Sequence, residues 1–336
     1  MDKRLASLSN WLSDDLKLSI ITFEPASADA SFRRYFRVTI DQATSNQQLK
    51  LPTTFIVMDS PPEHEDNALF IACTKVLTAC NLNVPIIYEK NLKLGFLIIS
   101  DLGTDVFQQA LTASSANNLY SDAMNALLNM QSKAKTLSIP NYSSEKLSTE
   151  IQLFDDWYIQ HYHQSELSID EHKSLKQVSK LLIDSALEQP QVLVHRDFHC
   201  RNLLVTEKNN PGIIDYQDMV VGPITYDLVS LFKDCYIEWP HSQVEQWITD
   251  FQEQSIKLGI HQIQNQSQWL QWFDWMGVQR HLKVLGIFSR LYFRDGKNQY
   301  LQDMPLTYHY LIQTCEKYSK LQPLAIILKK YPIKLG

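Results

Sequence analysis

The sequence lacks the features that mark several large classes of protein. Its five cysteines form no C-x-x-C pair, which argues against a disulfide framework or a cysteine zinc site and favours free buried thiols in a reducing compartment. No run approaches the roughly 20 apolar residues of a membrane-spanning helix, and the N-terminus has no apolar signal-peptide core. The net charge of −6 gives no broad basic surface. We therefore expect a cytoplasmic protein without nucleic-acid or membrane partners.

Length and composition bound the architecture. With 336 residues, 44% apolar and 20% charged, and no repeat, the chain is large enough for two lobes with separate cores. Apolar side chains at helical spacing predict helices at residues 5–16 and 65–80, with short β-prone runs between and after them. From residue 111 onward the periodicity is mainly helical. We expect an α+β protein with a small antiparallel-sheet lobe at 1–102 and a larger, mostly helical lobe at 103–336.

One polar segment between two apolar runs carries most of the chemistry. The runs read as buried strands, and the loop between them contains His195, Asp197 and Asn202. A third apolar run ends on Asp215, and Asp227 stands near an expected helix start. We interpret Asp227 as a cap for that helix or as a brace behind the loop. The order H-R-D, then Asn five residues later, then an acid at a strand end matches the catalytic segment of kinase-like phosphotransferases.

Phosphoryl transfer from ATP explains these residue types. Asp197 is the expected catalytic carboxylate, which orients or deprotonates the acceptor hydroxyl. Asn202 and Asp215 are the expected ligands of Mg²⁺, because this ion prefers hard oxygen donors. Two alternatives remain open at this point. The segment could be an ordinary polar turn, or His195 and His199 could bind a metal, although that spacing is typical of zinc ligands on a helix.

The nucleotide side of the small lobe is less distinctive. The loop between its first two strands contains no glycine, but Ser31, Arg33 and Arg34 could contact phosphate oxygens. Asp101-Leu102 follows the last strand of the lobe and stands where a hinge could pair its backbone with an adenine edge. The alternatives are a surface hairpin with two solvated arginines and an ordinary strand-to-helix turn.

Residues 193–205 and 213–218 resemble the aminoglycoside phosphotransferase and choline-kinase-like family, which shares the bilobal protein-kinase fold. A longer similarity links the chain to bacterial kinases that phosphorylate N-acetylmuramic acid and N-acetylglucosamine at the anomeric hydroxyl. It extends over residues 29–37, 57–63, 96–103, 226–240 and 274–297. The resemblance implies an ATP- and Mg²⁺-dependent sugar kinase of peptidoglycan recycling. Its partners would be an amino sugar and a nucleotide, and we expect it to act as a monomer.

The resemblance also indicates where the acceptor sugar would bind. A sugar needs hydrogen-bonding groups for its ring hydroxyls and an apolar surface for its ring face, and we expect both from one cluster that follows a helix. The lactyl carboxylate of N-acetylmuramic acid needs a cation, which we expect from a later helix. These candidates are Asp234, Tyr236 and Trp239 in the cluster, and Arg280, His281 and Lys283 on the helix. Core packing of Trp239 and a solvated face for the later helix are the open alternatives.

The sequence departs from a typical kinase at the phosphate-binding lysine. The strand that should carry it has Met58 near that position, and the helix that should carry its glutamate partner has Ala72 and Cys73 in its middle. Both halves of the ion pair are absent together, and Arg33 or Arg34 is the expected replacement. Two other functions stay open: a kinase of the same fold for an aminoglycoside or choline-like alcohol, and a non-catalytic nucleotide-binding pseudokinase.

Overall fold

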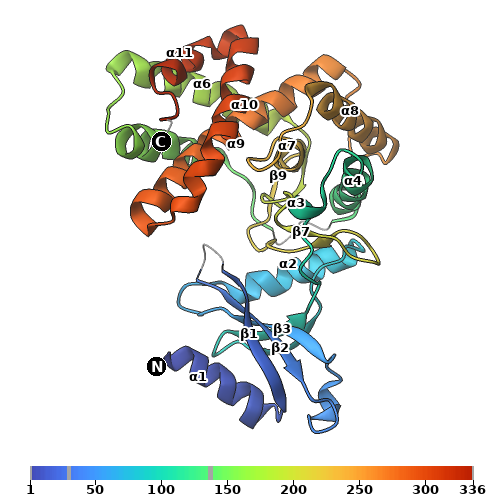
Figure 1. The fold of residues 1–336 in the computed structure, drawn as a ribbon. Coiled ribbons are helices and arrows are strands. Elements are labelled where there is room, and N and C mark those ends of the chain that lie inside the picture. Colours follow the sequence, from blue (N-terminus) through green and yellow to red (C-terminus); the bar gives the residue numbers. More distant parts are fainter. Residues whose placement is uncertain (1, 29–31, 135–138, 335–336) are drawn as a thin grey trace. The chain divides into compact units, whose positions relative to one another are not determined.

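The computed structural model describes residues 2–28, 32–134 and 139–334. The chain forms two compact units (Figure 1). The first consists of Met1–Asp105 and Leu204–Gln217, and the second of Val106–Leu203 and Asp218–Gly336. The expected α+β class is confirmed, since an antiparallel sheet near the N-terminus is followed by a mostly helical remainder.

The first unit is built on a five-stranded antiparallel sheet of order β1-β2-β3-β5-β4. The strands are β1 (Ile20–Ala28), β2 (Arg34–Ile40), β3 (Thr54–Asp59), β4 (Ile87–Asn91) and β5 (Phe96–Ser100). Central strands β3 and β5 are almost fully buried, which accounts for their nearly continuous apolar sequences. A short 3-10 turn, Gln47–Leu49, lies between β2 and β3.

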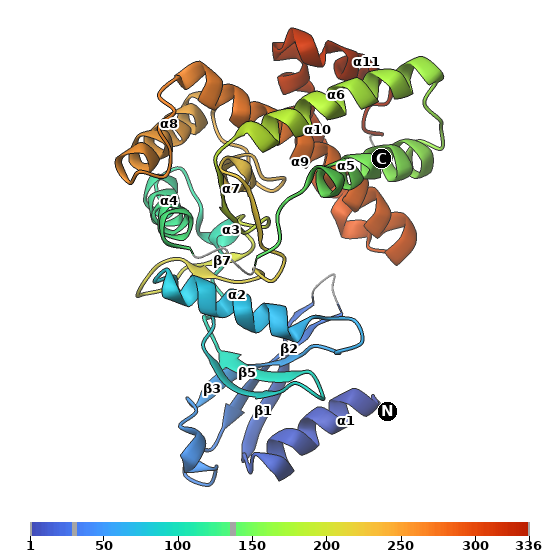
Figure 2. The same ribbon diagram turned by 180° about the vertical axis from the view of Figure 1, so that it is seen from behind.

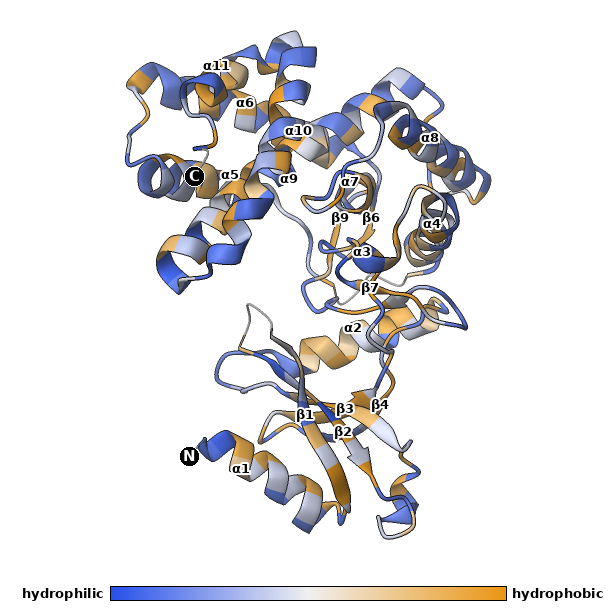
Figure 3. Cartoon of the chain, viewed as in Figure 1, coloured by the Kyte–Doolittle hydropathy of each residue, from blue (hydrophilic) through white to orange (hydrophobic). Residues whose placement is uncertain are grey.

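Two helices lie on opposite sides of this sheet (Figure 2). Helix α1 (Lys3–Asn10) continues into a π-helical turn, Trp11–Asp15, and buries Leu8 and Trp11 against the sheet. Helix α2 (Asn67–Ala79) is capped by the Asp66 side chain. Figure 3 shows hydrophobic residues along α2 and the adjoining strands, as the predicted amphipathic helix requires.

The segment Leu204–Gln217 adds a short strand pair, β7 (Leu203–Leu204) with β8 (Gly212–Ile213). Gly212 bridges to Asn83 and packs on Leu102. A Cβ atom at position 212 would lie 3.2 Å from Leu102 Cδ1, so a glycine permits this close approach. The residues that follow the predicted catalytic segment are thereby fixed against the end of the small lobe's last strand.

The second unit is dominated by helices, with one antiparallel strand pair, β6 (Gln191–Val194) with β9 (Val220–Pro223). Its helical elements are α3 (Phe107–Ala110), α4 (Ala116–Lys133), α5 (Ser144–Leu153), a π-helical continuation (Phe154–Tyr162), α6 (Ile169–Glu188), α7 (Tyr226–Phe232), α8 (His241–Lys257), α9 (Gln266–Asp295), a 3-10 segment (Asn298–Asp303), α10 (Met304–Lys317), a 3-10 turn (Ser319–Leu321) and α11 (Gln322–Lys330). None of the helices described is both long and apolar enough to cross a membrane.

Helix α9 is the central element of the second unit. It packs against α5, α6, α7 and α10, and its middle is buried on every side. Gly286 allows the close approach to α5, because a Cβ atom there would lie 2.4 Å from the Leu153 carbonyl oxygen. The predicted acceptor-binding residues of this helix, Arg280, His281 and Lys283, are 6%, 3% and 5% exposed. The alternative of a solvated face is therefore wrong for these three residues.

Candidate active site

The loop between β6 and β7 contains the predicted catalytic sequence, and α7 holds its backbone from behind. The buried Asp227 carboxylate accepts the backbone N–H groups of His195 at 2.7 Å and of Arg196 at 3.0 Å. Asp227 therefore braces the loop, one of the two roles predicted for it. Burial raises the pKa of the Asp227 carboxyl to about 7, and its two hydrogen bonds from the backbone fix the start of the loop.

Arg196 adopts a left-handed backbone with φ of 78°. A non-glycine residue held in this region costs on the order of 1–3 kcal/mol and persists only where its surroundings fix it. Here the Arg196 carbonyl accepts Arg280 Nη1 at 3.2 Å and Ser230 Oγ at 3.4 Å. Its guanidinium donates to Glu150 at 2.5 Å. Both its backbone groups and its side chain are therefore pinned, which sets the direction of the next residue.

That next residue, Asp197, presents its carboxylate at the edge of this buried network. Its side chain is 34% exposed, and Arg280 Nη1 lies 3.9 Å from Oδ1. Burial opposes ionisation of the carboxyl, but nearby Lys283 and Arg280 outweigh this and lower the pKa of Asp197 to about 2. Asp197 is therefore an anion throughout the neutral range and is reachable by a substrate.

The two predicted metal ligands lie in different units, Asn202 in the second and Asp215 in the first. Asn202 Nδ2 donates to the Asp197 carbonyl at 3.0 Å, which fixes the orientation of the amide. Asp215 follows β8 with a left-handed φ of 64°, and its Oδ1 accepts Gln217 Nε2 at 2.7 Å. Amide and carboxylate oxygens are donors that suit Mg²⁺, which keeps several waters and phosphate oxygens in its shell.

The alternative metal site at His195 and His199 receives no support from its surroundings. Among residues 2–28, 32–134 and 139–334, no three or more His, Cys, Asp or Glu side chains are grouped to hold a metal ion. The His195 ring packs on Phe198, with ring centroids 5.6 Å apart. Burial lowers the pKa of His199 to about 3. Its ring makes a T-shaped contact with the Tyr236 ring, with centroids 5.4 Å apart.

The predicted phosphate-binding arginines are both engaged in ion pairs, and Ser31 lies outside the described residues. Arg33 Nη2 lies 2.6 Å from Glu65 Oε2, with both side chains largely buried. Arg34 instead pairs with Asp2 and, through Nε and Nη2, with fully buried Asp59 at 2.9 and 2.5 Å. The two arginines therefore pair with acids in different parts of the unit. Arg33 pairs with Glu65, just before α2, whereas Arg34 pairs with Asp2 and with Asp59 at the end of β3.

The predicted hinge residues are held within the first unit. The Asp101 carboxylate accepts Arg37 Nε at 2.6 Å and Nη2 at 3.0 Å, and also the Gly103 backbone N–H at 3.0 Å. Burial opposes ionisation, but the Arg37 pair outweighs it, so the pKa of Asp101 is lowered. These contacts fix the turn in which Leu102 packs against Gly212.

The three residues of the predicted acceptor cluster lie in different surroundings. Tyr236 contacts the loop that holds Asp197, whereas Asp234 and Trp239 make structural contacts. The Tyr236 ring contacts His199 and stacks under Arg201, whose guanidinium carbon is 3.5 Å from the ring centroid. Asp234 is buried and accepts the backbone N–H groups of Tyr236 and Ile237 at 2.9 and 3.0 Å. Burial raises the pKa of this carboxyl.

Trp239 packs within the second unit. Its indole N–H donates to the Tyr120 hydroxyl at 2.8 Å, and its ring lies edge-on to Trp247. These contacts fit the alternative that Trp239 serves in packing.

The three helix residues predicted to bind an acceptor carboxylate are all buried in α9. Arg280 faces Asp197 and also donates to the Tyr226 hydroxyl at 3.4 Å. Lys283 donates to the same hydroxyl at 3.1 Å and lies 3.6 Å from Glu150. His281 Nε2 contacts the Lys233 carbonyl at 3.0 Å, away from Asp197. The structure thus brings Arg280 and Lys283 to the buried side of the loop that holds Asp197 and separates His281 from them.

The comparison with known families decides the class of this site. The profile of the phosphotransferase enzyme family matches residues 22–263, a span that includes the loop, Asp215 and Asp227. The chain belongs to the phosphotransferase enzyme family. The resemblance seen in the sequence is thereby confirmed.

Relatives of this phosphotransferase match it over nearly its whole length. A Pseudomonas putida protein named N-acetylmuramate/N-acetylglucosamine kinase is 37% identical over 97% of this chain and 96% of its own length. Proteins of the same name are 38% identical in Pseudomonas aeruginosa and 34% identical in Neisseria meningitidis, with 98% and 97% of this chain covered. They cover 98% and 95% of their own lengths.

Solved structures share the fold of this phosphotransferase at low sequence identity. The choline kinase LicA from Streptococcus pneumoniae gives a TM-score of 0.60 at 11% identity, over 94% of this chain and 100% of that one. The ADP-bound aminoglycoside phosphotransferase APH(2'')-Ib gives 0.59 at 14% identity, over 94% and 98%. The predicted kinase-like fold is therefore confirmed.

Sequence reasoning missed the group of residues that supports Asp197 in this phosphotransferase. The Glu150 carboxylate, on α5, accepts hydrogen bonds from the Arg196 guanidinium and the Tyr142 hydroxyl, and it forms an ion pair with Lys283. Burial opposes ionisation of Glu150, but these cations outweigh it and lower its pKa. The available signal was the pair of charged residues Arg280 and Lys283 in the mainly apolar middle of this helix, residues 275–289, since charges in such a segment are buried only when paired.

Proposed function

We propose that this protein transfers the γ-phosphoryl group of ATP to the anomeric hydroxyl of N-acetylmuramic acid or N-acetylglucosamine. The observation that carries the proposal is the identity of 34–38% over nearly the full length of three proteins that bear this name. The expected biological role is peptidoglycan recycling in the cytoplasm.

Asp197 is the proposed catalytic carboxylate. It orients the anomeric hydroxyl and receives its proton as the sugar oxygen bonds to the γ-phosphorus. The bond between that phosphorus and the β,γ-bridging oxygen breaks, so the products are the sugar 1-phosphate and ADP. The pinned backbone of Arg196 and the Arg280 guanidinium support this role, because they fix the direction in which the carboxylate points. Accurate orientation contributes a large share of catalysis in such reactions.

Asn202 and Asp215 are the proposed Mg²⁺ ligands, and the assignment of Asp215 rests on its place in the sequence pattern. When bound, the ion neutralises charge on the β- and γ-phosphates. The left-handed backbone of Asp215 and its bond from Gln217 hold the carboxylate in one conformation. Such backbone strain recurs at functional sites.

The charges around Asp197 favour a neutral or anionic acceptor over a cationic one. Arg196, Arg280 and Lys283 lie beside the loop together with the acids Glu150, Asp197 and Asp227, so these groups carry no excess of acid. A choline- or aminoglycoside-type acceptor would require an excess of acids there. The Tyr236 ring with Arg201 stacked on it supplies an aromatic surface and a partly exposed cation next to His199.

Product identity tests the acceptor. We expect ATP-dependent turnover with N-acetylmuramic acid or N-acetylglucosamine, and a product whose phosphorus couples to the anomeric proton in the NMR spectrum. The same assay is run with choline and an aminoglycoside as acceptors. A 6-phosphate product, or turnover with those two acceptors only, would contradict the proposed substrate while preserving the phosphotransferase class. Absence of turnover with every acceptor, with ATP still bound, would favour a pseudokinase.

Arg33 is the proposed replacement for the missing strand lysine, because its pairing with Glu65 reproduces a cation–acid pair at the approach to α2. An arginine can form two parallel hydrogen bonds to a phosphate. We expect Arg33→Ala to raise the KM for ATP by about tenfold, equivalent to about 1.4 kcal/mol of lost binding, with little change in the KM for sugar. Initial-rate kinetics with each substrate varied in turn measures this.

Arg34→Ala is the matched control for this substitution. Because Arg34 is tied to Asp59 and Asp2, its loss should lower the unfolding temperature and leave the KM for ATP within about twofold, a change of less than ~0.5 kcal/mol. If Arg34→Ala changes ATP kinetics and Arg33→Ala does not, the phosphate-binding role belongs to Arg34. Unchanged kinetics in both variants would remove both arginines from it.

A further inference from the structure

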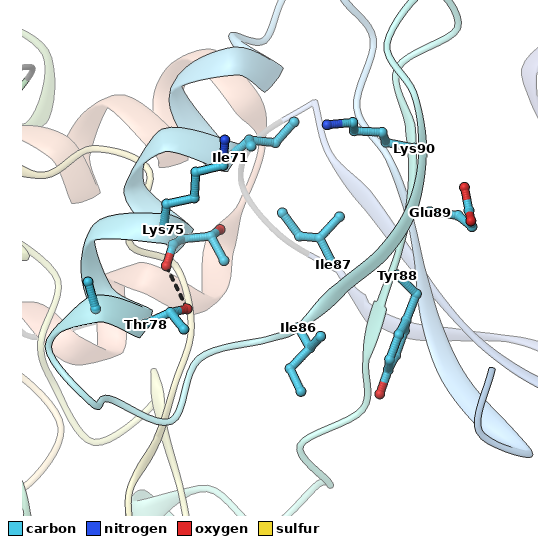
Figure 4. A pocket seen from close by; sticks show the side chains of 10 residues that line it. Ile71, Lys75, Thr78, Ile86, Ile87, Tyr88, Glu89 and Lys90 are labelled. Carbon is cyan, nitrogen blue, oxygen red and sulfur yellow. Dashed lines mark hydrogen bonds between the residues drawn. The ribbon is translucent and has the colours of Figure 1, made fainter. Parts of the chain in front are cut away.

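A groove of about 570 Å³ lies between α2 and β4 in the first unit, and none of the residues that line it has been given a role above (Figure 4). Its surface is mainly aliphatic, with Ile71 on the helix, Ile87 at the start of the strand and Ile86 just before it. Ile86 is 60% exposed, a large apolar side chain left open to solvent. The volume falls in the range of small-molecule sites, about 300–1,000 Å³.

Two lysines stand at one end of the groove, Lys75 on α2 and Lys90 on β4, and the amino group of Lys90 points toward the helix (Figure 4). Both side chains are exposed, and neither ammonium group has an ion-pair or hydrogen-bond partner among the residues that the structure describes. The acid of this wall, Glu89, lies on the side of the strand away from α2. The charge that faces the open end is therefore positive.

We propose that this groove binds a small amphipathic carboxylate and that its occupancy is transmitted to the segment that carries Asp215. The carboxylate would lie between the ammonium groups of Lys75 and Lys90, where each can donate charge-assisted hydrogen bonds. The aliphatic part would cover Ile71, Ile86 and Ile87 and remove their surface from water. The ligand class follows from these two features: a carboxylate matches the two ammonium groups at one end, and an aliphatic chain matches the apolar surface along the rest.

Thr74 connects the groove to the interior of the unit, since it lines the groove and is also hydrogen-bonded to Tyr216. Its hydroxyl proton is used toward the Phe70 carbonyl at 2.9 Å, so the Tyr216 hydroxyl donates to Thr74 Oγ1, also at 2.9 Å. The rings of Phe70 and Tyr216 stack with centroids 5.3 Å apart. One helix therefore forms the groove wall on one side and holds Tyr216 on the other.

The contacts continue from Tyr216 to the proposed metal ligand. Gln217, the next residue, donates to the Asp215 carboxylate at 2.7 Å, and its carbonyl lies 4.0 Å from Cys73 Sγ on α2. Asp215 has a strained left-handed backbone, so a small shift of α2 changes how firmly this conformation is held. A ligand that favours one position of α2 shifts the conformational population of residues 215–217.

Binding is tested with octanoate as the probe, measured by titration calorimetry on the full chain. We expect saturable binding of one octanoate and at least fivefold weaker binding of octanol, which has the same chain without the charge. The double variant Lys75→Gln/Lys90→Gln should bind octanoate at least fivefold more weakly. Lys93→Gln, an exposed lysine in the turn after β4, should bind it as the wild type does. Equal affinity for octanol, or unchanged affinity in the double variant, would overturn the proposal.

Transmission is tested by hydrogen–deuterium exchange of residues 212–218 with and without saturating octanoate. We expect octanoate to change exchange of this segment in the wild type by at least threefold, and to leave it unchanged in Tyr216→Phe, which removes the hydrogen bond to Thr74 and keeps every residue that lines the groove. Octanoate binding without any change of exchange in the wild type would overturn the proposed link. Neither readout requires an acceptor sugar, so failure here is separate from failure of the proposed kinase reaction.

Discussion

Asp197→Asn is expected to lower turnover by about 10²–10⁴-fold, the usual range for loss of a general base. The substitution keeps the size of the side chain and removes its negative charge. In the wild type the charge is secure, because Lys283 and Arg280 hold the pKa of Asp197 at about 2. The measurement is the rate of ADP formation at saturating ATP and sugar, with ATP affinity determined separately by calorimetry.

Binding of ATP should be nearly unchanged in this variant, since the carboxylate acts on the acceptor. Asp184→Asn is a matched control, because Asp184 is 59% exposed and pairs only with its helical neighbour Lys180 among the described residues. It should have wild-type turnover. Turnover of Asp197→Asn within about threefold of wild type would show that another group handles the acceptor proton, since base catalysis is normally worth far more.

The strand–loop–strand arrangement around Asp197 was predictable because its signals are local. Two apolar runs bracket a polar segment, and the structure places β6 before the loop and β7 after it. The helix predicted at residues 65–80 is α2, capped by Asp66 and ended before Pro85. Such elements are fixed by neighbours within a few residues, which a sequence pattern records directly.

The partners of the charged residues were not predictable, because they come from distant parts of the chain. Arg34 reads as a solvated or phosphate-binding arginine, yet its partner Asp59 is the last residue of another strand. Lys283 and Arg280 were assigned to the acceptor, but Glu150 and the Arg196 carbonyl receive them. The spacing of residues in α9 does not indicate that Glu150, on helix α5, is the acid that pairs with Lys283.

Asp215→Ala is expected to reduce Mg²⁺-dependent turnover by at least about 10³-fold, because it removes a charged ligand from the ion that neutralises the phosphates. Asn202→Ala should be milder, since it removes a neutral ligand. The measurement is turnover against Mg²⁺ concentration for each variant, with EDTA-treated wild type as the metal-free reference. Equal activity of the wild type with and without divalent ions would exclude both assignments.

The left-handed backbone of Asp215 requires a second variant to separate metal binding from folding. Alanine at a φ of 64° is strained by about 1–2 kcal/mol, whereas asparagine tolerates this region. Asp215→Ala should therefore also lower the unfolding temperature, while Asp215→Asn should keep it and still lose most of its Mg²⁺-dependent turnover. If Asp215→Asn retains wild-type turnover, the charge of Asp215 is dispensable. The loss seen with alanine would then arise from its backbone or from the missing side-chain oxygen, and not from the missing charge.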